Sequence, residues 1–199
     1  MTRATADNDP RLDRREAMRV LLDKRGDLLL VIGLGSTTWD AAAAGDHDRN
    51  LYLWGAMGAA AMVGLGLAIA QPERRVLVVT GDGEILMGLG GLATIGVQRP
   101  PNLALAVFDN GRYAETGMQA SHTDQGVSLC GVARSCGIDG VYDIADSAAL
   151  QDLARLVHAG CDRTLFARIA IRADEPPRVL PSRDGVFLKN RFRRALGVE

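Results

Sequence analysis

Four short apolar runs divide the chain, and three of them are followed by polar, glycine-containing loops. The runs are DLLLVI (27–32), RVLVVT (75–80), NLALAVF (102–108) and TLFARIAI (164–171). Segments without polar alternation are typical of strands buried on both faces, as in parallel sheets that helices cover on both sides. The pattern therefore predicts four parallel β-strands.

Helical periodicity fills the segments between these strands. An amphipathic surface helix is predicted over 13–24, and further helices over 55–70, 85–97, 124–136 and 146–160. The last of them has acidic and hydroxyl residues at its start and a glycine at its end, as helix caps require. Alternating strands and helices indicate an α/β fold with a doubly wound, mostly parallel sheet and helices on both faces.

Length and composition fit a single domain. The length of 199 residues is within the usual range for one domain, and 47% of the residues are hydrophobic, which is enough for a large core. We predict one domain over 1–199, with flexible ends at 1–10 and at a basic, helical tail over 182–199. A solvated helix is the simpler interpretation of that tail, and an anion-binding or subunit-contacting segment is the alternative.

Charge and cysteine content give no sign of nucleic-acid or membrane partners. The net charge of −1 provides no bulk attraction to either. The sequence has three cysteines and no CxxC motif among them, which suits a reducing cytoplasm; they are Cys130, Cys136 and Cys161. The uncharged segment 51–70 is long enough to span a bilayer, but its many glycines and alanines favour a buried helix. With no apolar signal core near the start, we expect a cytoplasmic protein.

Polar loops follow three of the predicted strands, at 33–38, 81–84 and 109–111. The carboxyl ends of parallel strands meet at one rim, where α/β proteins bind ligands. Asp82 and Asn110 are separated by one strand–helix–strand unit, so their side-chain oxygens can converge at that rim. Hard oxygens suit Mg²⁺, and glycines beside helix N-termini suit phosphate. The sequence therefore predicts a metal–diphosphate site.

Each part of this pattern has an ordinary interpretation when it is taken alone. GDG and DNG are common turn sequences. The GLG at 33–35 is not a dinucleotide fingerprint, because Thr38 stands where the third glycine would be. The combination of the two turns at this spacing is what favours a site.

The stretch GDGEILMGLGGLATIG…LAVFDNGRYAETG resembles the GDG…N signature of thiamine-diphosphate enzymes, specifically their diphosphate-binding domain. GAMG at 55–58 is similar to the segment that precedes a helix in the decarboxylase branch of that superfamily. The resemblance covers about 28–171. Within the superfamily, LGGLATIG…DNGRYAETGMQASHT is most similar to the family of sulfopyruvate decarboxylase β subunits and phosphonopyruvate decarboxylases.

This resemblance implies thiamine diphosphate and Mg²⁺ as cofactors. The implied metal ligands are the side chains of Asp82 and Asn110 and the backbone carbonyl of Arg112. The family usually has Asn-Asn where this chain has Asp109-Asn110, but the matched ligand is the second residue. The implied cofactor-binding residues are Gly35, Ser36, Thr37, Gly55, Met57, Gly81, Asp82, Gly83, Glu84, Asn110, Arg112 and Tyr113.

Two of these residues match positions with distinct roles in the family. Met57 corresponds to the bulky apolar residue that props the cofactor into its bent form, and Gly55 offers its carbonyl to the aminopyrimidine amine. Gly83 and Glu84 are expected against the diphosphate. Without the resemblance, a methionine between glycines would be interpreted as core filler.

The family activates its cofactor with a glutamate from a separate pyrimidine-binding domain. Glu73, Glu84 and Glu115 do not match the context of that residue. The resemblance therefore implies a pyrimidine-binding α subunit that supplies the glutamate, and hence a hetero-oligomer. His122 follows the metal-binding turn and is the candidate catalytic residue for proton transfer, although a loop histidine is often a bystander.

The implied function is that of the β subunit of a decarboxylase for small anionic 2-oxo acids, with sulfopyruvate, which gives sulfoacetaldehyde and CO₂, as the favoured substrate. Alternatives are phosphonopyruvate decarboxylase or another carboligase or oxidoreductase subunit that uses the same cofactor. An alternative of a different class is a non-catalytic nucleotide-binding or regulatory α/β module. Arg112, His122, the tail arginines or the partner could bind the second anionic group of the substrate.

Overall fold

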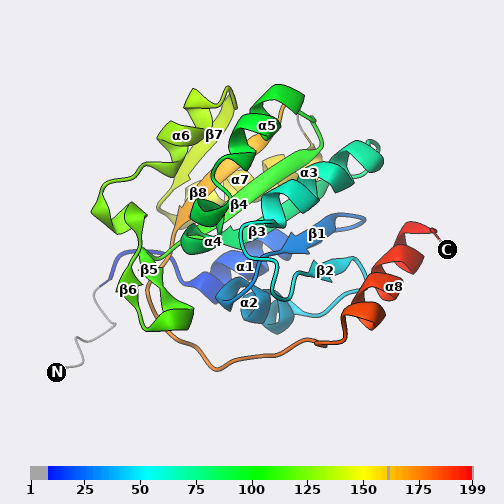
Figure 1. Ribbon diagram of the computed structural model, residues 1–199, viewed down its shortest axis with the longest axis horizontal. Helices are drawn as coiled ribbons and strands as arrows, with labels where there is room; N and C mark the ends of the chain where they lie inside the picture. The colour runs from blue at the N-terminus through cyan, green and yellow to red at the C-terminus, as the bar shows by residue number, and fades with distance from the viewer. Residues whose placement is uncertain (1–8, 161, 199) are drawn as a thin grey trace.

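The computed structural model describes residues 9–160 and 162–198. Six strands form a parallel sheet in the order β2-β1-β3-β4-β8-β7 (Figure 1). The strands are β1 (Leu29–Ile32), β2 (Asn50–Tyr52), β3 (Val76–Gly81), β4 (Leu103–Asp109), β7 (Gly140–Ile144) and β8 (Leu165–Ala170). The four predicted strands are β1, β3, β4 and β8, so the predicted fold class is confirmed.

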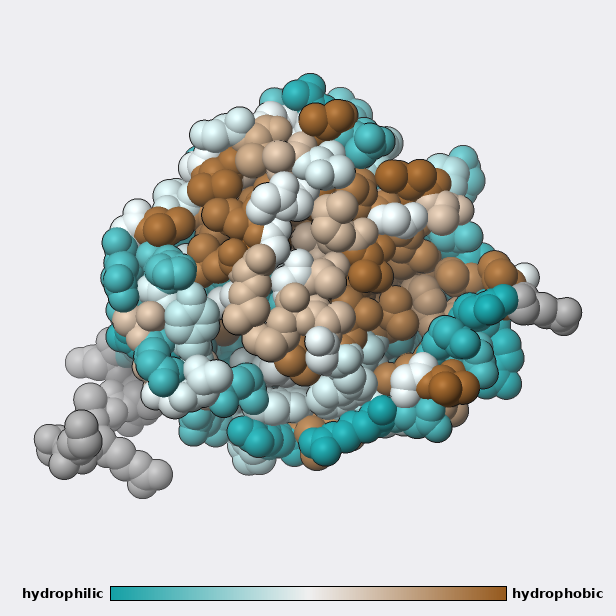
Figure 2. Space-filling view, in the orientation of Figure 1, coloured by the Kyte–Doolittle hydropathy of each residue, from teal (hydrophilic) through white to brown (hydrophobic). Residues whose placement is uncertain are grey.

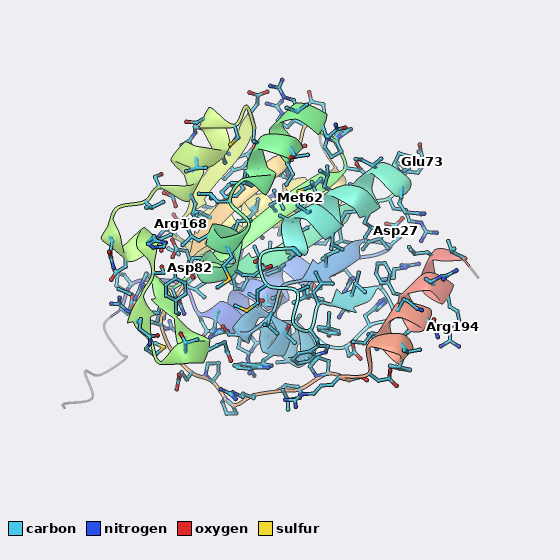
Figure 3. The ribbon with its side chains drawn as sticks, in the orientation of Figure 1. Asp27, Met62, Glu73, Asp82, Arg168 and Arg194 are labelled. Carbon is cyan, nitrogen blue, oxygen red and sulfur yellow. The ribbon has the colours of Figure 1, made fainter. Side chains whose placement is uncertain are left out.

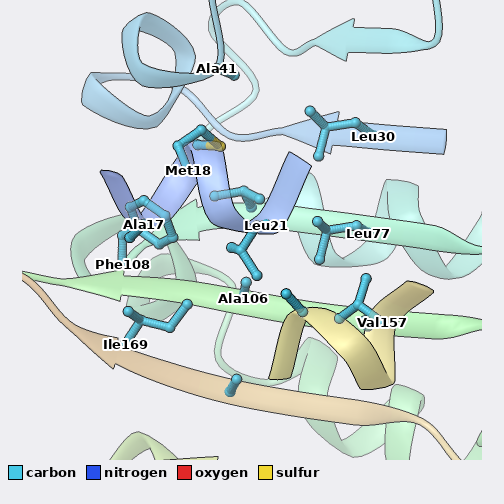
Figure 4. Close-up of a cluster of buried hydrophobic side chains, with 14 of the residues drawn as sticks. Ala17, Met18, Leu21, Leu30, Ala41, Leu77, Ala106, Phe108, Val157 and Ile169 are labelled. Carbon is cyan, nitrogen blue, oxygen red and sulfur yellow. The ribbon is translucent and has the colours of Figure 1, made fainter. Parts of the chain in front are cut away.

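Helices cover both faces of this sheet. They are α1 (Arg14–Leu22), α2 (Ser36–Ala44), α3 (Ala60–Ala70), α4 (Asp82–Met87), α5 (Gly91–Gln98), α6 (Leu129–Ser135), α7 (Ser147–Ala159) and α8 (Gly185–Leu196). Side chains of α1, α2 and α7 pack in one core cluster, while α3, α5 and α6 pack in the other. Figure 4 shows Met18 and Leu21 of α1 against Leu30 and Leu77 of neighbouring strands. Successive strand residues alternate between the clusters, as the pleat requires.

The order of the strands creates a crevice at the end of β1 and β3. From β1 the chain passes through α2 to β2 on one side, and then through α3 to β3, which pairs with the other side of β1. The loop after β1 leads into α2 and the loop after β3 leads into α4, and these two helices pack on opposite faces of the sheet, so the two loops diverge from each other. Such a topological switch point is where open α/β sheets bind ligands.

Two edge strands were not predicted. β2 and β7 are the outermost strands of the sheet and are only partly buried, so their sequences contain polar residues and no continuous apolar run. A second, two-stranded antiparallel ribbon pairs β5 (Arg112–Tyr113) with β6 (Gln119–Ala120). The 3₁₀ turns η2 (Ala114–Thr116) and η3 (His122–Gln125) complete this excursion after β4.

The helices predicted over 55–70 and 85–97 are divided differently in the structure. α3 begins only at Ala60, because Gly55 and Gly58 have positive φ angles of 79° that keep their segment in a loop. The second prediction becomes α4 and α5, which are separated at 88–90. A Cβ at Gly88 would lie 2.0 Å from the carbonyl oxygen of Gly58, so this interruption lets two backbones meet.

The remaining helix predictions fared better. The helices expected over 13–24 and 146–160 are α1 and α7, and Asp146 caps α7 by accepting from the backbone N–H of Ala149 at 2.9 Å. The segment 124–136 is helical only from Leu129, after η3. α3, which takes most of the long uncharged stretch, has 11 residues, and in the described part of the chain no helix has the length and apolarity to cross a membrane.

The C-terminal tail forms the helix α8, which packs against the domain. α8 lies beside β2, at the edge of the sheet (Figure 1). Leu188 joins one core cluster and Phe192 the other. Arg191 forms an ion pair with Asp46 at 2.6 Å. Residues 1–8 of the predicted flexible N-terminal end lie outside the described residues.

Two glycines of α3 provide a matched test of this packing. A Cβ at Gly64 would lie 2.1 Å from the rigid Val78 side chain of β3, whereas Gly66, on the exposed side, has nothing within 4 Å. We expect Gly64→Ala to lower the free energy of unfolding by about 1–3 kcal/mol through overpacking. Gly66→Ala should raise it by roughly 0.5–1 kcal/mol, because alanine favours the helix. Urea unfolding measures both, and equal effects would contradict the packing of α3 on β3.

Candidate active site

A cavity of about 620 Å³ lies at the carboxyl ends of β1, β3 and β4. The predicted cofactor-binding residues that line it are Gly35, Ser36, Thr37, Met57, Gly81, Asp82, Gly83, Glu84, Asn110, Arg112 and Tyr113. Gly55 is outside the lining, in the loop just before Met57. The cavity therefore brings together side chains from loops that are far apart in the sequence.

Asp82 is the first residue of α4 and directly follows β3. A carboxylate is favourable at this end of a helix. Its Oδ2 atom accepts a hydrogen bond from Ser121 Oγ at 2.5 Å, and Thr123 Oγ1 lies 3.3 Å from the same atom. Burial raises the pKa of Asp82 to about 6, and the negative charge of Asp109 acts in the same direction. The group is therefore a buried carboxylate whose ionised form needs a nearby cation.

Asp109, the last residue of β4, connects Asp82 to two further strands. Thr123 Oγ1 donates to Asp109 Oδ1 at 2.7 Å, and Arg168 Nε donates to Asp109 Oδ2 at 2.7 Å. Arg168 also bonds Asp143 of β7 at 3.1 Å. Figure 3 labels Asp82 and Arg168 at the same end of the sheet. These contacts form a continuous series across the ends of β3, β4, β8 and β7. Within the series, Arg168 balances the negative charge of Asp109.

Sequence reasoning missed these supporting residues. Ser121 and Thr123 come from the ribbon after β4, and their hydroxyls reach Asp82 from about forty residues away in the sequence. Arg168 interrupts the apolar run TLFARIAI. A lone arginine within a buried strand was the available signal, because it requires an acidic partner at the rim.

Asn110 forms a tight turn directly after β4 and lines the same cavity. Its Oδ1 accepts from the backbone N–H of Arg112 at 2.8 Å, which leaves one lone pair of that oxygen. Its backbone carbonyl accepts from Arg11 at 3.3 Å. The Arg112 side chain is directed to Asp124 at 2.5 Å, so only its backbone is free to contribute a metal ligand.

These donors fit Mg²⁺ with a diphosphate. Besides Glu84, whose carboxylate contacts the start of α3, the cavity supplies the buried carboxylate of Asp82, the amide oxygen of Asn110 and backbone oxygens, a set that leaves positions for phosphate oxygens. Among the described residues, no three His, Cys, Asp or Glu side chains gather as an all-protein metal centre. The ring of Tyr113 packs directly over the GDG turn. A Cβ at Gly83 would lie only 2.7 Å from this ring, so the contact requires glycine there.

Glu84 has a structural contact that the sequence did not predict. Its Oε1 atom accepts from the backbone N–H of Ala60 at 3.2 Å, at the start of α3. Burial raises the pKa of Glu84, while backbone N–H groups of 58–60 oppose that shift. The side chain therefore holds the loop that presents Met57, which is 52% exposed within the cavity.

His122 lies outside the cavity lining and is exposed. Its Nδ1 atom is 3.4 Å from the hydroxyl of Tyr113, and the two rings meet edge to face. Tyr113 does line the cavity. The predicted catalytic histidine is thus connected to the cavity through a tyrosine and does not face it directly.

Residues 35–171 match the sequence-family model of the C-terminal TPP-binding domain of thiamine pyrophosphate enzymes. The chain belongs to this family. A sulfopyruvate decarboxylase subunit beta from Methanothermobacter thermautotrophicus is 38% identical over 168 residues, which are 83% of this chain and 86% of that protein. A phosphonopyruvate decarboxylase from Streptomyces viridochromogenes is 38% identical over 77% of this chain, but over only 38% of its own length.

Solved structures of thiamine pyrophosphate enzymes share the fold. Benzoylformate decarboxylase from Polynucleobacter necessarius superposes with a TM-score of 0.67 at 17% identity, covering 89% of this chain and 36% of that one. Thiamine pyrophosphate (thiamine diphosphate) is the cofactor of this family, and the cavity has the oxygen donors and glycines that suit its Mg²⁺-bound diphosphate.

The burial of Asp82 predicts that its ionised carboxylate, which metal binding needs, lowers the stability of the metal-free protein. Its raised pKa means that the folded protein favours the neutral carboxyl, so stability is lost as the pH rises through about 6. Asp82→Asn keeps an oxygen acceptor for Ser121 and Thr123 without the charge. At pH 8 we expect it to raise the free energy of unfolding of the metal-free protein by roughly 3 kcal/mol.

The gain should shrink as the pH falls through 6 towards 4, as measured by urea unfolding at each pH. The exposed Asp152→Asn is the control and should show no such dependence. Mg²⁺ with thiamine diphosphate should stabilise the wild type and not the Asp82 variant. A variant that is less stable at every pH would contradict the burial argument.

Proposed function

We propose that the chain is the β subunit of a thiamine-diphosphate-dependent decarboxylase that converts sulfopyruvate into sulfoacetaldehyde and CO₂. The observation that carries the proposal is the 38% identity to a sulfopyruvate decarboxylase subunit beta over most of both chains. The convergence of the predicted cofactor residues in one cavity supports it. Relatives named as a subunit beta imply a partner subunit.

In this proposal Asp82, Asn110 and the carbonyl of Arg112 hold Mg²⁺. Gly35, Ser36, Thr37 and Gly83 face the diphosphate, with the free N–H groups at the start of α2 available to it. Ser121 and Thr123 fix the Asp82 carboxylate, so its orientation needs no reorganisation when the metal binds. When bound, the cofactor is the electron sink for the loss of CO₂.

The other residues of the cavity orient the reacting groups and exchange protons. Met57 supports the bend of the cofactor, on a loop that Glu84 holds in place. The hydroxyl of Tyr113 can exchange a proton with Nδ1 of His122, which connects the cavity with solvent. His122 therefore relays protons to the cavity indirectly, through the hydroxyl of Tyr113.

A pyrimidine-binding α subunit completes the site and supplies the activating glutamate. Apolar residues gather on the surface of α3, α4 and α5, where Figure 2 shows a broad hydrophobic area. The exposed members include Met62, Ile69, Met87 and Val97. Exposed apolar patches of this kind typically mark protein interfaces. A partner on this side would also cover Met57.

Phosphonopyruvate is the second candidate substrate. The similarity to a phosphonopyruvate decarboxylase has the same identity of 38% as the similarity to the sulfopyruvate enzyme. Sulfonate and phosphonate are both tetrahedral anions, so the same cationic groups could bind either. The higher charge of a phosphonate is the property that distinguishes them.

The proposal is tested on the chain copurified with its partner. CO₂ release should be fastest from sulfopyruvate, compared with phosphonopyruvate and pyruvate, and the chain alone should release none. Asp82→Ala should abolish the Mg²⁺-dependent binding of thiamine diphosphate in calorimetry, because the metal loses its carboxylate. Asp152→Ala on the exposed face of α7 is the control. Metal-independent binding of ATP or NAD without CO₂ release would instead support a regulatory module.

A further inference from the structure

Residues 172–184, here called the strap, connect β8 to α8 without forming a helix or strand (Figure 1). Arg178, Leu180 and Arg183 of the strap line the same cavity as Asp82 and Met57. The strap therefore forms part of the wall of the active site, although it lies beyond the segment that matches the family model.

Core side chains fix the strap in three places. Arg14 donates to the carbonyl of Asp174 at 3.3 Å, and Arg15 donates to the carbonyl of Pro177. Both arginines are themselves held by the buried carboxylate of Asp40. Further along, Trp54 Nε1 donates to the carbonyl of Ser182 at 2.8 Å. Two of the anchored carbonyls, those of Pro177 and Ser182, directly precede Arg178 and Arg183, the two strap arginines that line the cavity.

The arginines around the cavity differ in what they already bind. Arg14 is paired with Asp40 at 2.7 Å and Arg112 with Asp124 at 2.5 Å. Within the described chain, Arg178 and Arg183 form no ion pair with a carboxylate. The guanidinium of Arg178 instead lies 4.3 Å from the centre of the Trp39 ring, and that of Arg183 lies 5.6 Å from the Trp54 ring.

Stacking on a tryptophan leaves a guanidinium able to bind an anion. The aromatic face contacts the flat side of the group, while its N–H donors point outward in the plane. Glu115, in the same cavity, feels the charge of Arg178 but forms no ion pair with it, and burial raises the pKa of Glu115. The strap thus presents two positioned cations without a carboxylate that would compete for them at contact distance.

We infer that Arg178 and Arg183 bind the second anionic group of the substrate, the sulfonate or phosphonate, and so determine specificity. This inference rests on the proposed function. Of the earlier candidates, Arg112 is already paired and His122 lies outside the cavity, whereas Arg183 of the basic tail lines it. The diphosphate of the cofactor has similar chemistry, so the test has to separate the two anions.

The test uses the complex of this chain with its partner and the variants Arg178→Gln, Arg183→Gln and the double variant. We expect kcat/KM for sulfopyruvate to fall about tenfold or more in each single variant, since each loses a charge-assisted hydrogen bond. Pyruvate, which lacks the second anion, should change less than about twofold, because it makes no such contact. The affinity of each complex for pyruvate can be measured from how strongly pyruvate inhibits the turnover of sulfopyruvate.

Calorimetric titration with Mg²⁺ and thiamine diphosphate should give wild-type affinity in these variants. Arg155→Gln, on the exposed face of α7, is the matched control for the loss of one arginine. Equal losses for sulfopyruvate and pyruvate, weakened cofactor binding, or no change at all would each overturn the inference. If the wild-type complex releases no CO₂ from any of the substrates, the proposed function itself fails, which is a distinguishable result.

Discussion

The site depends on keeping one carboxylate, that of Asp82, in place while it is buried. A buried carboxylate is costly unless it is hydrogen-bonded or close to a cation. Ser121 donates the short hydrogen bond to Asp82, and Thr123, 2.8 Å from the Ser121 hydroxyl, donates to Asp109, whose own charge Arg168 balances. The second acid beside Asp82 is thus compatible with the proposed metal site, because a neighbouring strand provides its counter-ion.

A second buried acid organises the opposite side of the cavity. Glu84 is only two residues after Asp82 in α4, yet its carboxylate reaches the start of α3. Since α4 also meets the loop before α3 through the close contact of Gly88 with Gly58, the GDG turn and the Met57 loop are joined by two separate contacts. The backbone that presents Met57 is therefore attached to the helix that begins at Asp82.

The central part of this architecture could be predicted from the sequence, and its edges could not. The strands β1, β3, β4 and β8 are buried on both faces and read as continuous apolar runs, whereas β2 and β7 lie at the edges and carry no such signal. The convergence of Asp82 and Asn110 followed from the strand–helix–strand spacing. The pairing of Asp109 with Arg168 did not, because it joins residues 59 positions apart that only the sheet order brings together. The break between α4 and α5 falls at Gly88 and Gly90, which disfavour a helix locally, and it allows the close approach of Gly88 to Gly58.

The attachment of α8 has a consequence for how the enzyme would respond to heat. The helix is joined to both core clusters through Leu188 and Phe192, and it is the downstream anchor of residues 172–184. If α8 detaches, those residues lose their tether at one end while the sheet and the metal-binding turn stay intact. If Arg178 and Arg183 bind the second anion as we infer, partial unfolding from the C-terminus would make the enzyme less discriminating among 2-oxo acids before it releases its cofactor, so fidelity and cofactor retention would have different melting temperatures.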